Sequence, residues 1–154
     1  MTNSLGTACG LKFPMNDVTV SIVDWPQRKA ELIAIRQAVF VEEQNVPQSI
    51  EMDGKDPSCY HVLACDGAGK PIGTARLNRD GKIGRMAVLP RHRRSGVGAK
   101  LLRAIMDCGW SNGITDFHLS AQIDAVGFYR KMGFEPYGDE FEEAGIKHVN
   151  MRRA

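Results

Sequence analysis

A basic turn that carries two glycines is the most informative stretch of this chain. A largely apolar run over residues 83–89 ends at Pro90, and Arg91-His92-Arg93-Arg94-Ser95-Gly96-Val97-Gly98 then opens an amphipathic segment. Glycines remove side chains where a backbone must approach a guest closely. The N–H groups of such a turn and of the helix that follows form an anion site, and arginines favour phosphate oxygens. We therefore expect this turn to bind a phosphate or diphosphate.

The size and charge of the chain limit what it can be. Its 154 residues suit one domain, since single domains cluster near roughly 100–150 residues. The net charge of +2 is nearly neutral, and this disfavours a nucleic-acid binder, which usually carries a strong basic excess. The positive charge is concentrated instead at Arg91, Arg93 and Arg94.

The cysteines and the apolar stretches indicate the cellular compartment of the protein. Cys9, Cys59, Cys65 and Cys108 form no C-x-x-C pair, and no histidine stands at zinc-ligand spacing from them. Such scatter predicts reduced thiols, with neither a disulfide nor a metal framework. We find no signal peptide and no apolar stretch of the roughly 20 residues that a membrane span needs. The sequence thus predicts a cytoplasmic protein without a metal or a membrane partner.

The first third of the chain is expected to hold a leader, a strand and a helix. Residues 1–17 lack periodicity and are predicted to be a loose N-terminal leader, and residues 18–154 are predicted to be the domain. Alternation over residues 18–25 predicts a strand. The helical spacing of Leu32, Ile35 and Val39 predicts a helix from residue 27 to about residue 43. Residues 45–58 are predicted to be a loop long enough to be functional.

The rest of the pattern predicts a mixed α/β fold, a mixed sheet with flanking helices. Three strands should form an antiparallel meander, followed by helix, strand, helix with Asp124 as N-cap, and two short strands. The strands on either side of the first of these helices should be parallel. The predicted ranges are 60–65, 71–77 and 82–89 for the meander, then 96–110, 115–120, 124–132, 139–141 and 148–151.

Three motifs resemble those of the GCN5-related N-acetyltransferase (GNAT) family. The signature R/Q-x-x-G-x-G/A stands at residues 93–98, V-x-P at residues 88–90, and Y-x-x-x-G-F at residues 129–134. The matching core covers residues 82–134. Runs at residues 39–44 and 143–148 resemble a subgroup of small, often uncharacterised bacterial members. The resemblance implies the GNAT acyltransferase fold.

The resemblance also implies acetyl-coenzyme A as co-substrate. Its diphosphate would accept N–H groups of the turn, and its pantetheine arm would lie along the strand that ends at Val88, like an added strand. A side-chain amide of Gln122 stands where many relatives have Asn. The alternative is a basic turn that is only solvated. The cofactor-binding candidates are Met86, Ala87, Val88, Arg93, Arg94, Ser95, Gly96, Val97, Gly98 and Gln122.

Tyr129 is the candidate catalytic residue. Acetyl transfer expels a thiolate, and a phenol placed nearby can protonate it as the C–S bond breaks. The alternative is a core tyrosine packed beside Phe128. The sequence context of Gly133 and Phe134 favours the catalytic role.

The residues that bind and deprotonate the acceptor amine are less clearly indicated by the sequence. An amine must lose a proton to attack, and Glu42, Glu43, Asp53, His61, Glu143 and His148 are candidate bases. His148 could equally be a strand histidine satisfied by the backbone, which we favour, and Glu42 and Glu43 a solvated helix end. Arg76 could contact an acceptor carboxylate or pair with a neighbouring acid, and we favour the pair. The aromatic residues expected in the core are Trp25, Phe40, Trp110 and Phe117.

These residues favour an acetyl-CoA-dependent N-acetyltransferase that transfers acetyl directly to an amine in a ternary complex. Neither Cys59 nor Cys65 sits beside a motif that suggests a covalent nucleophile. The alternative is a non-catalytic coenzyme A-binding sensor or scaffold, and a weaker third is a nucleic-acid binder that uses Arg91 to Arg94. The partner is expected to be a small-molecule or peptide amine. Its identity and the oligomeric state, monomer or homodimer, stay open.

Overall fold

A computed structural model describes residues 6–7, 9–10 and 17–154. Within the predicted leader, β1 (Gly6–Thr7) pairs with β2 (Cys9–Gly10) in antiparallel fashion. The remainder of that leader prediction, residues 1–5, 8 and 11–16, lies outside the described residues.

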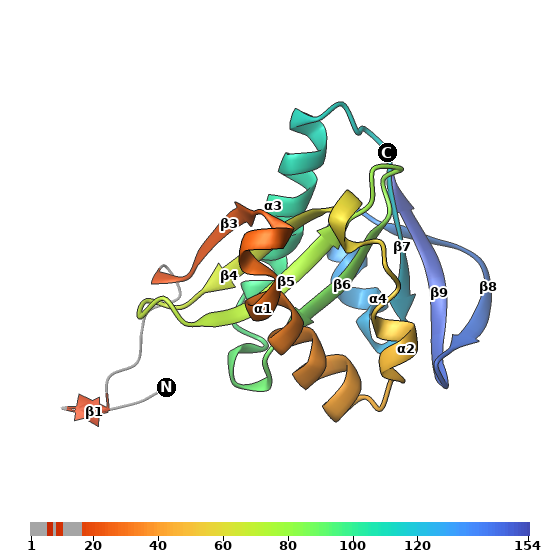
Figure 1. Cartoon of the computed structure of the whole chain (residues 1–154). Helices are drawn as coiled ribbons and strands as arrows, with labels where there is room; N and C mark the ends of the chain where they lie inside the picture. The colour runs from red at the N-terminus through yellow and green to blue at the C-terminus, as the bar shows by residue number, and fades with distance from the viewer. Residues whose placement is uncertain (1–5, 8, 11–16) are drawn as a thin grey trace.

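The predicted meander is confirmed as part of a four-stranded antiparallel sheet. Its order is β3-β4-β5-β6, formed by β3 (Thr19–Val23), β4 (Tyr60–Cys65), β5 (Pro71–Leu77) and β6 (Ile83–Val88). Helix α3 (Val97–Ser111) packs on one face of this sheet and α1 (Trp25–Arg36) on the other (Figure 1). Alternation along β4 explains both layers, because Val62 and Ala64 join the core under α3 while Leu63 joins the cluster under α1.

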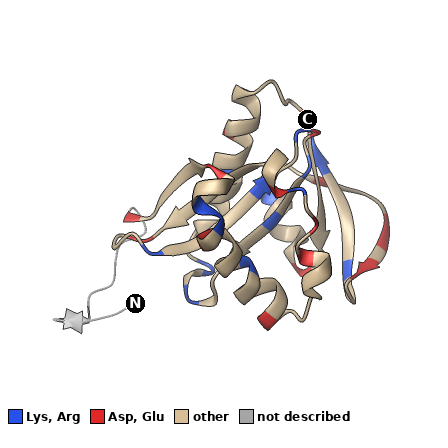
Figure 2. Cartoon of the chain, viewed as in Figure 1, with Lys and Arg blue, Asp and Glu red and all other residues tan. Residues whose placement is uncertain are grey.

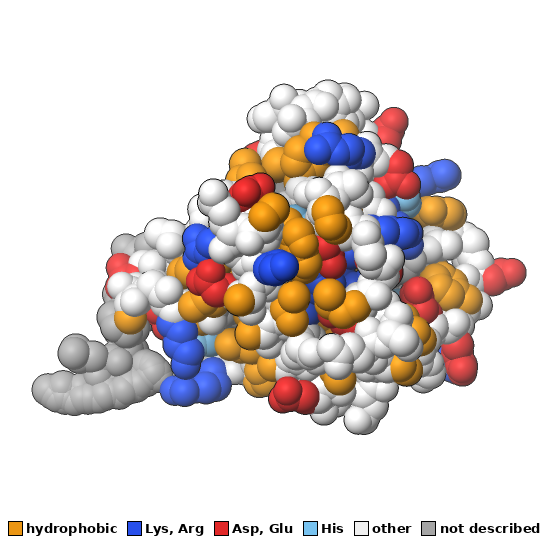
Figure 3. Space-filling model, viewed as in Figure 1, with side chains coloured by type: hydrophobic (Ala, Val, Ile, Leu, Met, Phe, Trp, Pro, Cys, Tyr) orange, Lys and Arg blue, Asp and Glu red, His pale blue; other side chains and the backbone are white. Residues whose placement is uncertain are grey.

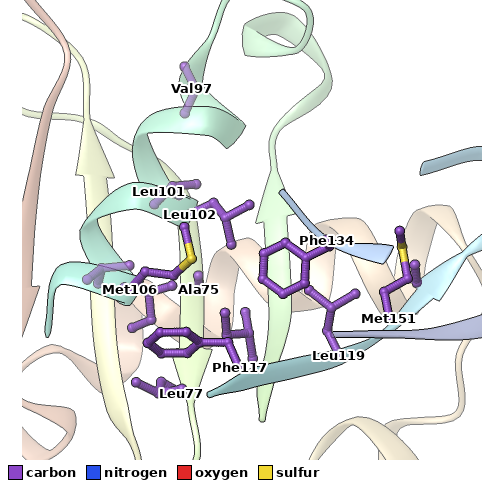
Figure 4. Packing of buried hydrophobic residues seen from close by; sticks show 14 of the residues in the cluster. Ala75, Leu77, Val97, Leu101, Leu102, Met106, Phe117, Leu119, Phe134 and Met151 are labelled. Atoms are coloured by element: carbon purple, nitrogen blue, oxygen red, sulfur yellow. The ribbon is translucent and has the colours of Figure 1, made fainter. Parts of the chain in front are cut away.

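The larger core lies between the sheets and α3. In Figure 4 the rings of Phe117 and Phe134 lie beside Leu102 and Met106 of α3. All four side chains are buried, and burying each one fully contributes roughly 1.5–3 kcal/mol. Gly109 of α3 is required for this packing, since a Cβ there would stand 2.7 Å from the Phe117 ring.

The chain ends in a three-stranded antiparallel sheet of order β7-β9-β8. It consists of β7 (Phe117–Gln122), β8 (Glu135–Glu143) and β9 (Ile146–Arg153), and η5 (Ile123–Ala125) and α4 (Val126–Lys131) lie between β7 and β8. The last two strands are much longer than the sequence predicts. Strand β8 is polar and mostly exposed, so its residues show no alternation, and its backbone pairing with β9 holds it in place.

The two sheets meet at one point. Lys82 and His118 form a parallel bridge, and the His118 N–H donates to the Gly81 carbonyl at 3.1 Å. Gly81 has φ 98° and a Cβ there would stand 2.3 Å from the Asp116 carbonyl oxygen, so this close approach requires glycine. Within the described ranges the predicted parallel pairing is confirmed only at this bridge, and β6 and β7 diverge beyond it.

The first predicted helix needs correction. It begins at Trp25, which was expected to end the strand, and it changes at residue 37 into a π-helical segment, η2 (Gln37–Glu43). Pro26 in the first turn explains the start. The predicted loop at 45–58 holds a short helix α2 (Gln48–Glu51) and a turn η3 (Asp56–Ser58).

Three finer predictions can also be compared with the structure. The helix expected at 96–110 is confirmed to within a residue, and it follows the short turn η4 (Pro90–His92). The predicted Asp124 N-cap is wrong, because η5 extends the chain to α4 and no side chain caps that helix. Phe117 is in the core as expected, whereas Trp110 is 43% exposed under the Arg153 guanidinium.

No described helix has the length and apolar character that crossing a membrane requires.

Candidate functional site

A cavity of about 240 Å³ opens where β6 and β7 diverge. Figure 3 views the face that α1 and α2 cover, where hydrophobic, acidic and basic side chains are interleaved. The cavity combines residues of the segment after α1, of both diverging strands, of α4 and of the β8–β9 hairpin. They are Phe40, Gln44, Val46, Ile50, Glu51, Lys82, Ile83, Gly84, Arg85, Met86, Leu119, Ser120, Gln122, Ala125, Tyr129, Glu143, Ala144, Ile146 and His148.

The glycine turn lies where β6 ends and α3 begins. Arg94 and Gly96 have φ of 61° and 89°, so the turn bends through the left-handed region just before the helix. Among residues 17–154, the backbone N–H groups from 94 to 98 have no protein acceptor. A row of unpaired donors at a helix N-terminus is the arrangement that an anion site requires, and the sequence predicts such a site at this turn.

The Arg93 side chain, predicted to bind the cofactor, has protein partners in this structure. Its Nε donates to the Val88 carbonyl at 2.8 Å, and its two Nη atoms donate to the Glu43 carboxylate at 2.7 and 2.6 Å. This hydrogen bond lowers the pKa of Glu43 and raises that of Arg93. Arg93 therefore ties the turn to the end of β6 and to η2, and the unpaired donors of the turn are its backbone N–H groups.

Tyr129 lies at the wall of the cavity between two aromatic rings. It packs edge-on against Phe128 and Phe134, with ring centroids 5.0 and 6.1 Å away. Its hydroxyl lies 3.6 Å from the Met86 sulfur on β6. Burial raises the pKa of Tyr129 to about 12. The two interpretations of this residue are thus compatible, since the ring is packed in the core and the side chain also lines the cavity.

Gln122, at the end of β7, also lines the cavity. Its Nε2 donates to the Gln44 Oε1 at 2.9 Å. Gln44 follows η2, so this bond joins the segment after α1 to the end of β7. Both residues line the cavity. The amide expected to contact the cofactor therefore has a protein partner in this structure.

A buried ionic cluster holds the segment after α1 against β5 and β6. Arg36 donates to Glu51 and to Asp56, each at 2.8 Å, and both ends are nearly inaccessible. Arg85 of β6 donates to the same Glu51 carboxylate at 3.0 Å and has φ 48°. The sequence interpretation missed these residues, although the charge of Arg85 within an apolar strand was a signal.

The favoured interpretation of Arg76, as a partner of a neighbouring acid, is confirmed. Arg76 donates to Asp53 at 2.8 Å and to Asp56 at 3.1 Å. Burial acts to raise the pKa of both carboxyls, but the hydrogen bonds and charges of Arg36, Arg76 and Arg85 hold both pKa values below their usual range. In Figure 2, acidic and basic positions are both marked along the ribbon on the side of the sheet that faces the viewer.

The remaining base candidates differ in position. Glu42 and Glu43 are exposed and lie outside the cavity lining, as does Asp53. His61 is buried, bonds the Asp56 carbonyl at 2.9 Å and has its pKa lowered by burial. His148 and Glu143 do line the cavity.

One observation agrees with the favoured interpretation of His148, a strand histidine satisfied by the backbone. It is 8% exposed on β9, and its Nδ1 lies 2.7 Å from the Ile146 carbonyl oxygen. The backbone therefore satisfies one ring nitrogen. In the part of the chain that the structure describes, no group of three or more His, Cys, Asp or Glu side chains could hold a metal ion.

Diverging strands beside a glycine turn define the class of this fold, and comparison with known proteins agrees. An acetyltransferase (GNAT) domain model matches residues 24–154, so the chain belongs to the GNAT acetyltransferase family. The uncharacterized N-acetyltransferase YjcF of Bacillus subtilis is 38% identical over 123 residues, 77% of this chain and 87% of its own.

Solved structures show the same fold. The crystal structure of Escherichia coli ElaA superimposes with a TM-score of 0.79 at 26% identity, over 89% of this chain and 99% of its own. An aminoglycoside 6'-N-acetyltransferase solved in complex with coenzyme A gives a TM-score of 0.68 at 17% identity, over 88% of this chain and 96% of its own. The predicted family and the mixed α/β fold with flanking helices are confirmed.

Proposed function

We propose that this protein transfers an acetyl group from acetyl-coenzyme A directly to an amine, with both substrates bound at once. The observation that carries the proposal is one continuous site. The unpaired N–H groups of the turn, the free edge of β6 and the cavity with Tyr129 follow one another along β6. A substrate with an anionic end, an extended arm and a reactive acyl group matches this order.

The residues fit coenzyme A at two places. The diphosphate would bind the backbone N–H groups of residues 94–98 at the start of α3, where the helix dipole favours an anion. The pantetheine arm would lie along Met86, Ala87 and Val88. This edge of β6 is available because β5 pairs with the opposite edge and β7 bridges to this part of the described chain only at Lys82, before β6 begins. Extended ligands bind such an edge through main-chain hydrogen bonds.

Tyr129 is the proposed general acid. The thiol of coenzyme A is a simple thiol, and such groups have pKa values near 8.5. The Tyr129 pKa of about 12 keeps the phenol protonated at every working pH. A phenol with this pKa is a weaker acid than the thiol, so the role requires its proton to move within a direct hydrogen bond to the sulfur as the C–S bond breaks. Its place beside Met86, on the strand that would hold the arm, supports this role.

Direct transfer is supported by the positions of the thiols. Cys59, Cys65 and Cys108 do not line the cavity, and burial raises the pKa of each thiol. A thiol with a raised pKa is a poor nucleophile near neutral pH. A covalent acetyl-cysteine step at any of these three residues therefore has no support.

A panel of amines, including peptides, polyamines and aminoglycosides, tests the proposal. We expect thiol release from acetyl-coenzyme A that depends on at least one amine. Binding of coenzyme A without release for any amine would favour the non-catalytic sensor or scaffold. No binding of coenzyme A would refute both.

A further inference from the structure

The ring nitrogens of His148 have different environments. Nδ1 lies 2.7 Å from the Ile146 carbonyl oxygen, and a carbonyl oxygen only accepts. Nδ1 therefore carries the hydrogen, and neutral His148 must have its lone pair on Nε2. Within residues 17–154, Nε2 has no hydrogen-bond partner. The strand geometry thus leaves a basic nitrogen without a protein donor.

The ring is held in place in the cavity. It stacks on Phe141 of the neighbouring strand, with centroids 5.8 Å apart and planes at 19°. Gln122 of β7 is its cross-strand partner, and side chains at paired positions share a face of the sheet. His148 therefore lines the same cavity as Gln122 and Tyr129.

The other ionisable groups of the cavity are poorly suited to accept a proton. The Oε2 atom of Glu51 already accepts hydrogen bonds from two guanidinium groups, those of Arg36 and Arg85. Tyr129 is protonated at neutral pH. Lys82 and Arg85 are cationic, and Glu143 is exposed at the end of β8, where no hydrogen bond or ion pair among the described residues orients its carboxylate. The charged groups that line the cavity are Glu51, Lys82, Arg85 and Glu143, and those beside the ring on the hairpin are Glu142 and Lys147.

We propose that His148 Nε2 is the general base that deprotonates the acceptor amine, an inference that rests on the proposed acetyl transfer. An ammonium acceptor first gives one proton to Nε2, which passes it to solvent. The neutral amine then forms a C–N bond with the thioester carbonyl carbon while the C–S bond breaks. Tyr129 protonates the departing sulfur and regains a proton from the new amide nitrogen. The sum is an ammonium and a thioester giving an amide, a thiol and one proton.

The substitution His148→Asn separates the structural and catalytic roles. An Asn side-chain N–H can take the place of Nδ1–H and bond the Ile146 carbonyl, but nothing replaces Nε2. We expect kcat/KM at pH 7 to fall by roughly 10²–10⁴-fold with an aliphatic amine. Coenzyme A affinity and the melting temperature should change little. The control is His118→Asn, on β7 and outside the cavity lining, which should keep full activity.

The pH profile identifies the base. In the native protein kcat/KM should rise with pH through a histidine ionisation, at the same pH for acceptors whose own pKa values differ. In His148→Asn this rise should vanish, and only the ionisation of the amine should remain. The difference between the two proteins should therefore shrink as the pH approaches the amine's pKa, where the acceptor is already neutral.

Two outcomes would overturn the inference. One is a His148→Asn protein with native rate and profile. The other needs no variant: a native profile whose single rise follows the pKa of each acceptor would show that no protein group accepts the proton, even if His148→Asn failed to fold. If instead no amine is acetylated by the native protein, the proposed function itself has failed. This last outcome is recognised from the turnover of the native protein alone, so it is not confused with the two outcomes that overturn the role of His148.

Discussion

Replacing Tyr129 by phenylalanine removes one oxygen and leaves the ring. The phenol oxygen has a weak contact in this structure, 3.6 Å from the Met86 sulfur. An ordinary hydrogen bond contributes about 0.5–1.5 kcal/mol net, so we expect the free energy of unfolding to change by less than about 1 kcal/mol. The edge-on packing against Phe128 and Phe134 stays intact. Any large effect on the rate therefore reports on the hydroxyl.

The expected kinetic effect of Tyr129→Phe is large. A general acid contributes roughly 10²–10⁴-fold, or about 2.7–5.5 kcal/mol of activation free energy. Thiol release under single-turnover conditions measures the chemical step, and calorimetry with coenzyme A measures affinity, which should hardly change. The loss should shrink with an acyl donor whose thiolate leaves more easily. A native single-turnover rate in Tyr129→Phe would refute this role and leave solvent as the proton source.

Two further substitutions test the anion site and the ionic cluster. Gly96→Val should abolish coenzyme A binding in a calorimetric titration. The control is Gly113→Val, which strains a φ of 83° just beyond the far end of α3; it should lower the stability of the fold by a similar amount and still bind coenzyme A normally. Equal binding by the two variants would remove the anion-site argument. Arg76→Met removes one of the two guanidinium partners of Asp53 and of Asp56, which keep Arg85 and Arg36, and should lower the free energy of unfolding by about 1–3 kcal/mol, so an unchanged denaturation midpoint would contradict it. Because the pKa values of Asp53 and Asp56 are lower in the folded state, native stability should be complete at neutral pH and fall as acid protonates them, from roughly pH 4 downward, in acid-unfolding experiments.

Local signals predict much of this fold. The meander, α3 and the glycine turn follow from alternation, helical spacing and turn residues over a few positions. The lengths of β8 and β9 do not, because β8 is a polar edge strand defined by its pairing with β9. The π-helical end of the first helix likewise depends on what η2 packs against.

The site was predictable where it depends on sequence-local chemistry. The donors of residues 94–98 and the position of Tyr129 belong to short motifs. The bond from Arg93 to Glu43 spans 50 residues, and that from Gln122 to Gln44 spans 78. Such partners depend on how distant segments meet, so the sequence predicted Arg93 as a phosphate ligand and did not predict its carboxylate partner.

Direct acetyl transfer to an amine is tested most directly with isotope-labelled acetyl-coenzyme A and an acceptor from the panel. The reaction is quenched during the first turnover, and the label is located by mass spectrometry. We predict one labelled amide for each thiol released, and no label on the protein at any time. Label on the protein before the amide forms would contradict direct transfer, and thiol release without a labelled amide would contradict amine acetylation altogether.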